Sequence, residues 1–215
     1  MKKSLLIALL LLLPVLVLAT PSSSSAQQPK MDIKLFLGVS GTTFVSQLET
    51  GRLKDSFFGW QIGFGPRIRR RNAFIEIQFS FNRWAFAFQD AADDGTPIEA
   101  VGQVNSFELP LIMGYIPYKN SIFKLFLYAA YVNHFNTKIL VDATLLDGSG
   151  TEISFKLRPK EIDFAIYQAI ARVGVNFDIA MFNFDFNYSI SMNSATKTSY
   201  RTGYHQLQVN LSYLF

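Results

Sequence analysis

The chain has 215 residues, a formal net charge of +4, and 49% hydrophobic and 15% aromatic residues, with no cysteine. The lack of cysteine excludes a disulfide framework, a thiolate metal site and a cysteine nucleophile. The nearly balanced charge, without a clustered basic face, argues against nucleic-acid binding.

The N-terminus has the pattern of a cleavable export signal. Two lysines precede an apolar run over residues 5–19, and small residues ending in Ala26 follow it. This apolar run is shorter than the ~20 residues that a membrane-spanning helix needs. We therefore predict a signal peptide over residues 1–26, with cleavage after Ala19 as the alternative, and a disordered leader over residues 27–31.

Apolar and polar residues then alternate with a period of two, which is the pattern of β-strands. The sequence predicts eight strands: residues 32–46, 56–69, a long third strand after residue 72, 106–117, 121–136, 163–179, one from residue 182, and one ending at residue 215. Their connections alternate between long and short, as in outer-membrane barrels with short periplasmic turns. The short turns are predicted at residues 69–72, 118–120 and 180–183, and the long loops at 47–54, 89–105, 137–161 and 195–203.

Three local features depart from simple alternation. After Arg83 the apolar residues change parity, which predicts a β-bulge that keeps Trp84 and the following aromatics on the lipid side. Pro110 predicts a bulge or a locally unpaired position, because proline cannot donate to the ladder. In the third long loop, Asp-Gly-Ser-Gly at residues 147–150 predicts a hairpin that projects beyond the membrane.

One face of each strand is too aromatic for water, and the other is too polar for a dry core. Residues 181–215 show this most clearly, with phenylalanine, tyrosine and leucine alternating with asparagine, glutamine and serine. Lipid outside and a hydrogen-bonded interior satisfy both faces. The sequence therefore predicts an all-β fold over residues 32–215, an eight-stranded antiparallel transmembrane up-and-down β-barrel in the cell outer membrane. A soluble barrel of the lipocalin type is the structural alternative.

The polar face carries charges that would lie inside this barrel. The inward charges predicted by parity are Lys34, Arg67, Glu76, Arg83, Glu108, Lys124, Arg172, Asp178 and Asp185. Buried charges are costly unless they are paired, so this mixed set predicts a salt-bridge network that plugs the lumen. A small channel with a narrow ion path stays open as an alternative.

Candidate catalytic groups are few. His134 is predicted near the outer rim, where a lipid A hydrolase or acyltransferase would need an imidazole, but no spacing places a hydroxyl nucleophile and a carboxylate beside it. His205 is predicted as a lipid-facing interfacial residue. The carboxylates of residues 90–99 do not match a calcium loop and indicate a solvated segment. We predict no enzyme activity, no cofactor and no metal site.

Two local motifs add a resemblance to the barrel pattern. Glu-Leu-Pro-Leu at residues 108–111 and the ending at residues 210–215 resemble those of small outer-membrane barrels, most closely the PorT-like barrels. The ending looks like the signal read by the outer-membrane assembly machinery, with aromatic Tyr213 and Phe215, but it has Asn210 where that signal often has glycine. The resemblance implies an outer-membrane location and the assembly route of such barrels, and PorT-like members are associated with protein secretion across this membrane. We therefore predict a non-enzymatic accessory protein that serves secretion. Its expected partners are outer-membrane lipid, the assembly machinery and secretion-system proteins, and not nucleic acid.

Overall fold

The computed structural model describes residues 28–46, 53–54, 57–91, 97–145, 152–157, 165–194 and 202–215. The predicted signal peptide over residues 1–26 lies outside these ranges. The first strand begins at Lys30, inside the predicted leader. No helix in the described ranges is long and apolar enough to cross a membrane.

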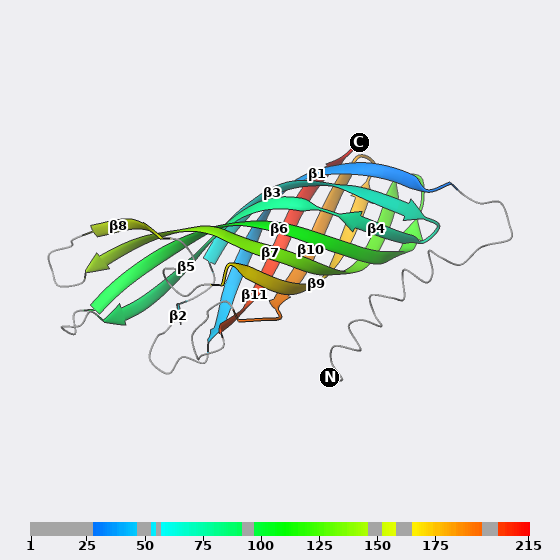
Figure 1. The fold of residues 1–215 in the computed structure, drawn as a ribbon. Helices are drawn as coiled ribbons and strands as arrows, with labels where there is room; N and C mark the ends of the chain where they lie inside the picture. The colour runs from blue at the N-terminus through cyan, green and yellow to red at the C-terminus, as the bar shows by residue number, and fades with distance from the viewer. Residues whose placement is uncertain are drawn as a thin grey trace, which may run out of the picture.

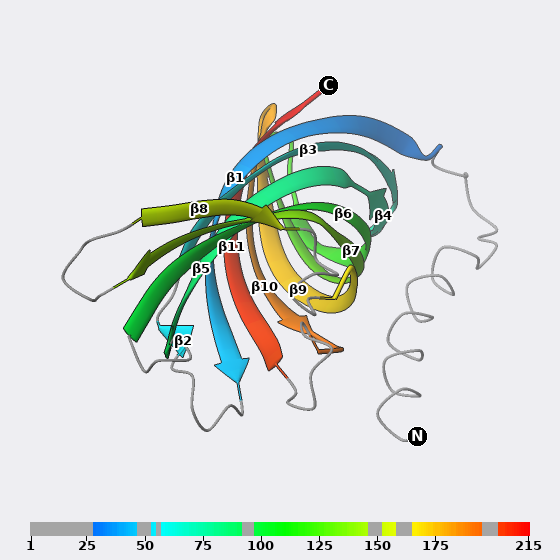
Figure 2. The ribbon, with the colours of Figure 1, turned by 60° about the vertical axis from the view of Figure 1, so that its left-hand side comes forward.

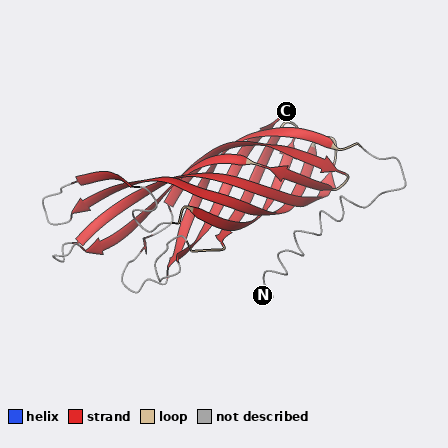
Figure 3. Ribbon diagram, in the orientation of Figure 1, coloured by secondary structure: helices blue, strands red, loops and turns tan. Residues whose placement is uncertain are grey.

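Every regular element in the described ranges is a β-strand (Figure 3). The strands are β1 (Lys30–Ser46), β2 (Leu53–Lys54), β3 (Phe57–Arg70), β4 (Ala73–Ile77), β5 (Phe79–Ala91), β6 (Pro97–Lys119), β7 (Phe123–Leu145), β8 (Glu152–Leu157), β9 (Tyr167–Ile179), β10 (Phe182–Ser191) and β11 (Thr202–Leu214). All the pairings between them are antiparallel.

The strands close into a ring, which we call the wall (Figures 1 and 2). Strand β1 pairs with β3 on one side and with β11 on the other, so the first and last strands meet. Strands β4 and β5 act as one wall strand, because they keep one register against β3 and against β6. The wall of the described chain thus has eight strands, since β2 and β8 are short additions to β5 and β7. The predicted eight-stranded antiparallel barrel is confirmed.

The break between β4 and β5 is caused by a proline in the neighbouring strand β6. It falls at Gln78, whose backbone N–H donates to the carbonyl of Pro110 at 3.1 Å. Proline has no N–H to return the second ladder bond. The locally unpaired position predicted at Pro110 is therefore confirmed.

Three short turns lie at one end of the wall, which we call the turn end. Arg71 and Ala180 begin two-residue turns with positive φ angles of 56° and 53°. In the third turn, the Asn120 side chain accepts hydrogen bonds from the backbone N–H groups of Ile122 and Phe123 at 2.9 and 2.6 Å. Phe215 is at the same end, where it exchanges backbone hydrogen bonds with Ile33. The predicted short turns are confirmed.

A second sheet segment, which we call the arm, extends from the opposite end of the wall (Figure 1). Strands β6 and β7 have 23 residues each, whereas 9–11 residues cross a membrane. Beyond the wall β6 pairs with β5, and β7 pairs with β8. The predicted hairpin that projects beyond the wall is confirmed by the pairing of β7 with β8, whereas its predicted turn at residues 147–150 lies outside the described residues. The loop predicted at 89–105 is wrong over 89–91, which end β5, and over 97–105, where backbone pairing holds β6 as strand.

The outside of the wall is an apolar surface. Leu35, Phe64 and Leu207 are 49, 55 and 60% exposed, and similar side chains cover every wall strand. The inward parity carries buried glutamine, asparagine, serine and charged residues. A wall that is apolar outside and polar inside is stable only where its outer face meets hydrocarbon. The fold is therefore a transmembrane barrel.

The predicted bulge at Arg83 is wrong. Pairing of β5 with β6 runs without a shift from Ser80 to Ala91, so parity is kept. Trp84 consequently lies inside the barrel, 2% exposed, with its ring centroid 5.8 Å from that of Tyr204. Register shifts occur instead between β6 and β7, one where they leave the wall, between Asn105 and Ser106, and one at the turn end, between Tyr115 and Tyr118.

Candidate functional site in the barrel interior

Inward glycines make room for two aromatic rings in the narrow lumen. A Cβ atom on Gly63 would lie 2.4 Å from the Phe36 ring, and one on Gly174 would lie 2.4 Å from the Tyr128 ring. Each ring stands directly across the ladder from its glycine. Glycine in these strands therefore allows bulky side chains to fill the barrel.

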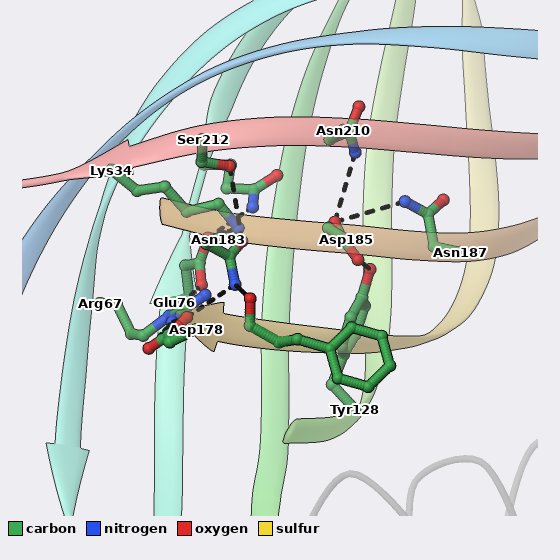
Figure 4. A network of polar contacts seen from close by, with 12 residues as sticks. Lys34, Arg67, Glu76, Tyr128, Asp178, Asn183, Asp185, Asn187, Asn210 and Ser212 are labelled. Atoms are coloured by element: carbon green, nitrogen blue, oxygen red, sulfur yellow. Dashed lines mark hydrogen bonds and ion pairs between the residues drawn. The ribbon is translucent and has the colours of Figure 1, made fainter. Parts of the chain in front are cut away.

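The inner network lies near the turn end and joins five residues of five strands (Figure 4). Glu76 accepts from Lys34 at 3.1 Å and from Arg67 Nε at 2.7 Å. Arg67 Nη1 also lies 3.0 Å from Asp178 Oδ1, to which Asn183 donates at 2.7 Å. Two cations and two carboxylates thus neutralise one another, and all of them are buried.

Aromatic rings fix the guanidinium at the centre of the inner network. The Arg67 guanidinium carbon lies 4.6 Å from the ring centroid of Phe126 and 5.5 Å from that of Phe74. The two rings meet edge to face at 5.2 Å. Ion pairs on one side and cation–π contacts on the other hold Arg67 across the lumen.

Asp185 occupies the middle of the lumen. It accepts from the Tyr128 hydroxyl at 2.7 Å, from Asn210 Nδ2 at 3.3 Å and from Asn187 Nδ2 at 3.4 Å (Figure 4). Asn210 in turn accepts from Gln61 on the opposite side. Neutral side chains therefore supply the hydrogen bonds of this buried carboxylate.

The outer network lies toward the arm end and is centred on Glu108. Its carboxylate is 2.7 Å from Arg172 Nη2 and 3.0 Å from His134 Nδ1. His134 Nε2 is 3.0 Å from the side-chain oxygen of Asn136, and Arg172 Nε donates to Ser189 at 2.8 Å. Above this layer, the buried rings of Trp84 and Tyr204 fill the lumen.

Most predicted inward charges lie where parity placed them. Those that are buried in the lumen are Lys34, Arg67, Glu76, Glu108, Arg172, Asp178 and Asp185. Lys124 has the inward parity but is only half-buried, because it lies at the turn end. Arg83 is the exception, since without the bulge it stays on the outer parity, where it donates to Gln103.

The two histidines have different environments. His134 lies near the outer end of the wall, as predicted, where it pairs with Gln168, and it is 1% exposed and faces the lumen. Strand β7 continues past it into the arm, which the sequence did not show. His205 is half-exposed and hydrogen-bonds Tyr188, as expected for the lipid-facing parity. In the described part of the chain, no group of three or more His, Asp or Glu residues is placed to hold a metal ion.

A pocket of about 230 Å³, which we call the basic pocket, opens at the turn end. Its lining residues are Gln28, Lys30, Arg69, Arg71, Ile116, Lys119 and Lys124. The sequence predicted the short turn at residues 69–72, which contains arginines, but it did not predict the pocket, because the lysines of the pocket are isolated in the sequence. Their common signal is position, since each of them lies at the turn-end terminus of a strand.

Comparisons with known proteins agree on the architecture. No family model and no curated protein matches the chain. The fold is similar to that of Ail, the attachment invasion locus protein of Yersinia pestis, with a TM-score of 0.50 and 13% identity over 86% of this chain and 99% of that chain. Neisserial surface protein A gives a TM-score of 0.42 and 13% identity, covering 88% of this chain and 100% of its own. The outer membrane enzyme PagL gives 0.37 and 10%, covering 85 and 98%. The likeness to Ail supports the barrel fold, and together with the apolar outer face it identifies the chain as an all-β barrel of the outer membrane.

Proposed function

We propose that this barrel is a non-enzymatic accessory protein of the outer membrane, which contacts other proteins at its ends and serves protein secretion in the manner of PorT-like barrels. The observation that carries the proposal is the filled interior. Within the inner network, and likewise within the outer network, the charged side chains form ion pairs with one another. Surfaces for contact with partners therefore lie at the turn end and on the arm.

The position of His134 favours this role over lipid A hydrolysis or acyl transfer. A lipid-modifying site must meet acyl chains or headgroups on the outside of the wall. His134 faces the lumen and is held between Glu108 and Asn136 at 3.0 Å each. From there the imidazole orients Glu108 and Asn136, and it does not contact a lipid ester outside the wall.

The turn end is the surface that we assign to secretion partners. In outer-membrane barrels, short turns and both termini lie on the periplasmic side. The turn at Arg71 is on this side, beside the basic pocket. Lipid around the wall and the outer-membrane assembly machinery during insertion are the other partners that we propose.

The test is a crosslinked pull-down of the tagged barrel from intact outer membranes, with partners identified by mass spectrometry. We expect secretion-system proteins, recovered at a lower yield when Arg70→Gln/Arg71→Gln neutralises the turn. The charge-matched control is Arg83→Gln/Lys138→Gln, whose residues lie toward the arm. Its yield should equal that of the wild type.

Two results would overturn the proposal. Recovery of only assembly proteins and abundant bystanders would leave the barrel without a secretion partner. A mass change in lipid A that depends on the barrel and is lost in His134→Ala would instead make the protein an enzyme. Folding of the His134→Ala variant is checked by circular dichroism, so that loss of the barrel is not read as loss of chemistry.

A further inference from the structure

Five cationic side chains converge on the basic pocket from separate elements. Lys30 begins β1, Arg69 is the last residue but one of β3, Arg71 is in the following turn, and Lys119 and Lys124 flank the turn between β6 and β7. Lys119 Nζ donates to the carbonyl oxygen of Arg71 at 3.0 Å, which ties two of these elements together.

In the inner network each cation is paired with a carboxylate, but most of the cations around the basic pocket are not. Among the described residues, Asp32 is the carboxylate paired with the group, at 2.6 Å from Arg69 Nη2. Lys30, Arg71, Lys119 and Lys124 lie around the same cavity with no ion pair in the described structure. Like charges that share a site repel one another, so the fold keeps four positive charges together at a cost. An anionic group in the cavity would remove this repulsion.

The pocket opens along the barrel axis and not toward lipid. Its floor includes Ile116, which is 2% exposed and points inward. Lys124 shares the inward parity of β7 with buried Phe126. Arg69 has the same parity on β3 as the buried Arg67. A ligand therefore enters from the aqueous compartment at the turn end, whereas a headgroup in the surrounding leaflet would meet the outward parity.

The size of the cavity limits what can enter. The cavity has a volume of about 230 Å³. This volume holds one or two carboxylate side chains but not a folded domain. Lysine and arginine donors in a partly enclosed mouth form charge-assisted hydrogen bonds with carboxylates.

We propose that the basic pocket binds an acidic, extended segment of a periplasmic protein. The inference rests on the accessory function proposed above and specifies the chemistry of its partner. The bound segment places acidic side chains among Lys30, Arg71, Lys119 and Lys124, and the rest of it lies across the turn end.

Binding is tested with the purified full-length mature barrel in detergent micelles and a fluorescein-labelled octaglutamate peptide, followed by fluorescence anisotropy. We expect saturable binding that weakens as salt is raised, and no binding of the octaglutamine peptide. Lys124→Gln should raise the Kd about threefold and Lys119→Gln/Lys124→Gln about tenfold, as expected when ion pairs of up to ~1 kcal/mol each are lost.

The matched control is Lys138→Gln, which makes the same substitution on the same strand at its exposed arm end. It should leave the Kd unchanged. Equal effects of Lys124→Gln and Lys138→Gln, or equal binding of octaglutamate and octaglutamine, would overturn the inference. Binding of vesicles that contain anionic phospholipid, with none of octaglutamate, would overturn it in favour of a lipid site.

This assay contains no partner protein, so it can fail while the pull-down recovers secretion proteins. In that case the accessory role stands and the pocket is not its contact. Conversely, octaglutamate binding without recovered secretion proteins would keep the acidic-ligand site and refute the secretion role.

Discussion

Asp178 on β9 connects its strand to β3 and to β10 through side-chain hydrogen bonds. Its carboxylate accepts two hydrogen bonds from Arg67, at 3.0 and 3.2 Å, and one from Asn183, at 2.7 Å. All three residues are fully buried. The charge of Arg67 is therefore balanced by groups that water cannot replace.

Asp178→Asn should lower the free energy of unfolding by ~3–5 kcal/mol, because it leaves part of a buried cation uncompensated. The measurement is urea unfolding of the barrel in micelles, followed by tryptophan fluorescence. Asp32→Asn removes the partly exposed pair with Arg69 at the turn end and should cost at most ~1 kcal/mol. Equal losses in the two variants would refute the assigned difference in burial.

At the same scale, parity predicted which residues face inward but not which residues meet. Arg67 and Asp178 are 111 positions apart in the sequence, and their contact depends on ring closure and strand stagger. The error at Arg83 has a similar origin. Aromatic residues after it suggested a change of face, but an aromatic residue can also fill the lumen, as Trp84 does against Tyr204.

Among the elements, β7 and β9 approach closely because a glycine faces a tyrosine. Gly174 lies opposite Tyr128, and the tyrosine ring occupies the space that a Cβ atom would need. The hydroxyl of the same ring holds Asp185 on β10. One missing side chain thus allows a contact that reaches a third strand.

Gly174→Ala should destabilise the barrel by about 1–3 kcal/mol, since the added methyl group overpacks the lumen and displaces Tyr128. Gly41→Ala is the control, because a Cβ there has no heavy atom within 4 Å. It should be neutral, or stabilising by up to about 1 kcal/mol, since alanine restricts the unfolded chain more than glycine does. Thermal unfolding of both variants decides between these outcomes, and a stable Gly174→Ala barrel would contradict the packing argument.

The lengths of the strands were harder to predict from the sequence than their presence. The turns at Arg71 and Ala180 follow from abrupt ends of alternation, and the structure places them where expected. The 23-residue strands β6 and β7 were predicted too short, because outside the membrane both faces of a sheet can be polar. Alternation then disappears although backbone pairing continues.

At the scale of the whole described structure, buried side chains occupy the interior of the wall. The inner network, Asp185 with its neutral donors, the outer network and the Trp84–Tyr204 contact follow one another along the lumen. An eight-stranded wall encloses a space that side chains can fill. The sequence indicated such a plug from its mixed inward charges.

The purified barrel in planar bilayers should therefore show no stable conductance steps. Arg67→Ala/Asp178→Ala removes a buried ion pair and its volume from the lumen and should introduce small, cation- or anion-carried leaks. Arg69→Ala/Asp32→Ala removes a pair at the turn end and should stay closed. Regular steps in the wild-type protein would favour the channel alternative.

The seam between β1 and β11 makes the completeness of the chain decisive for its folding. These strands pair from Lys34 with Leu214 to Ser46 with Thr202, so the N-terminal strand acquires its second neighbour only when the C-terminal strand arrives. Until then, the curled sheet has two edges of unpaired N–H and C=O groups that can recruit other chains. A product truncated before residue 202 would thus be an open, aggregation-prone sheet and not a smaller cylinder. Closure of the wall therefore depends on both ends of the chain together.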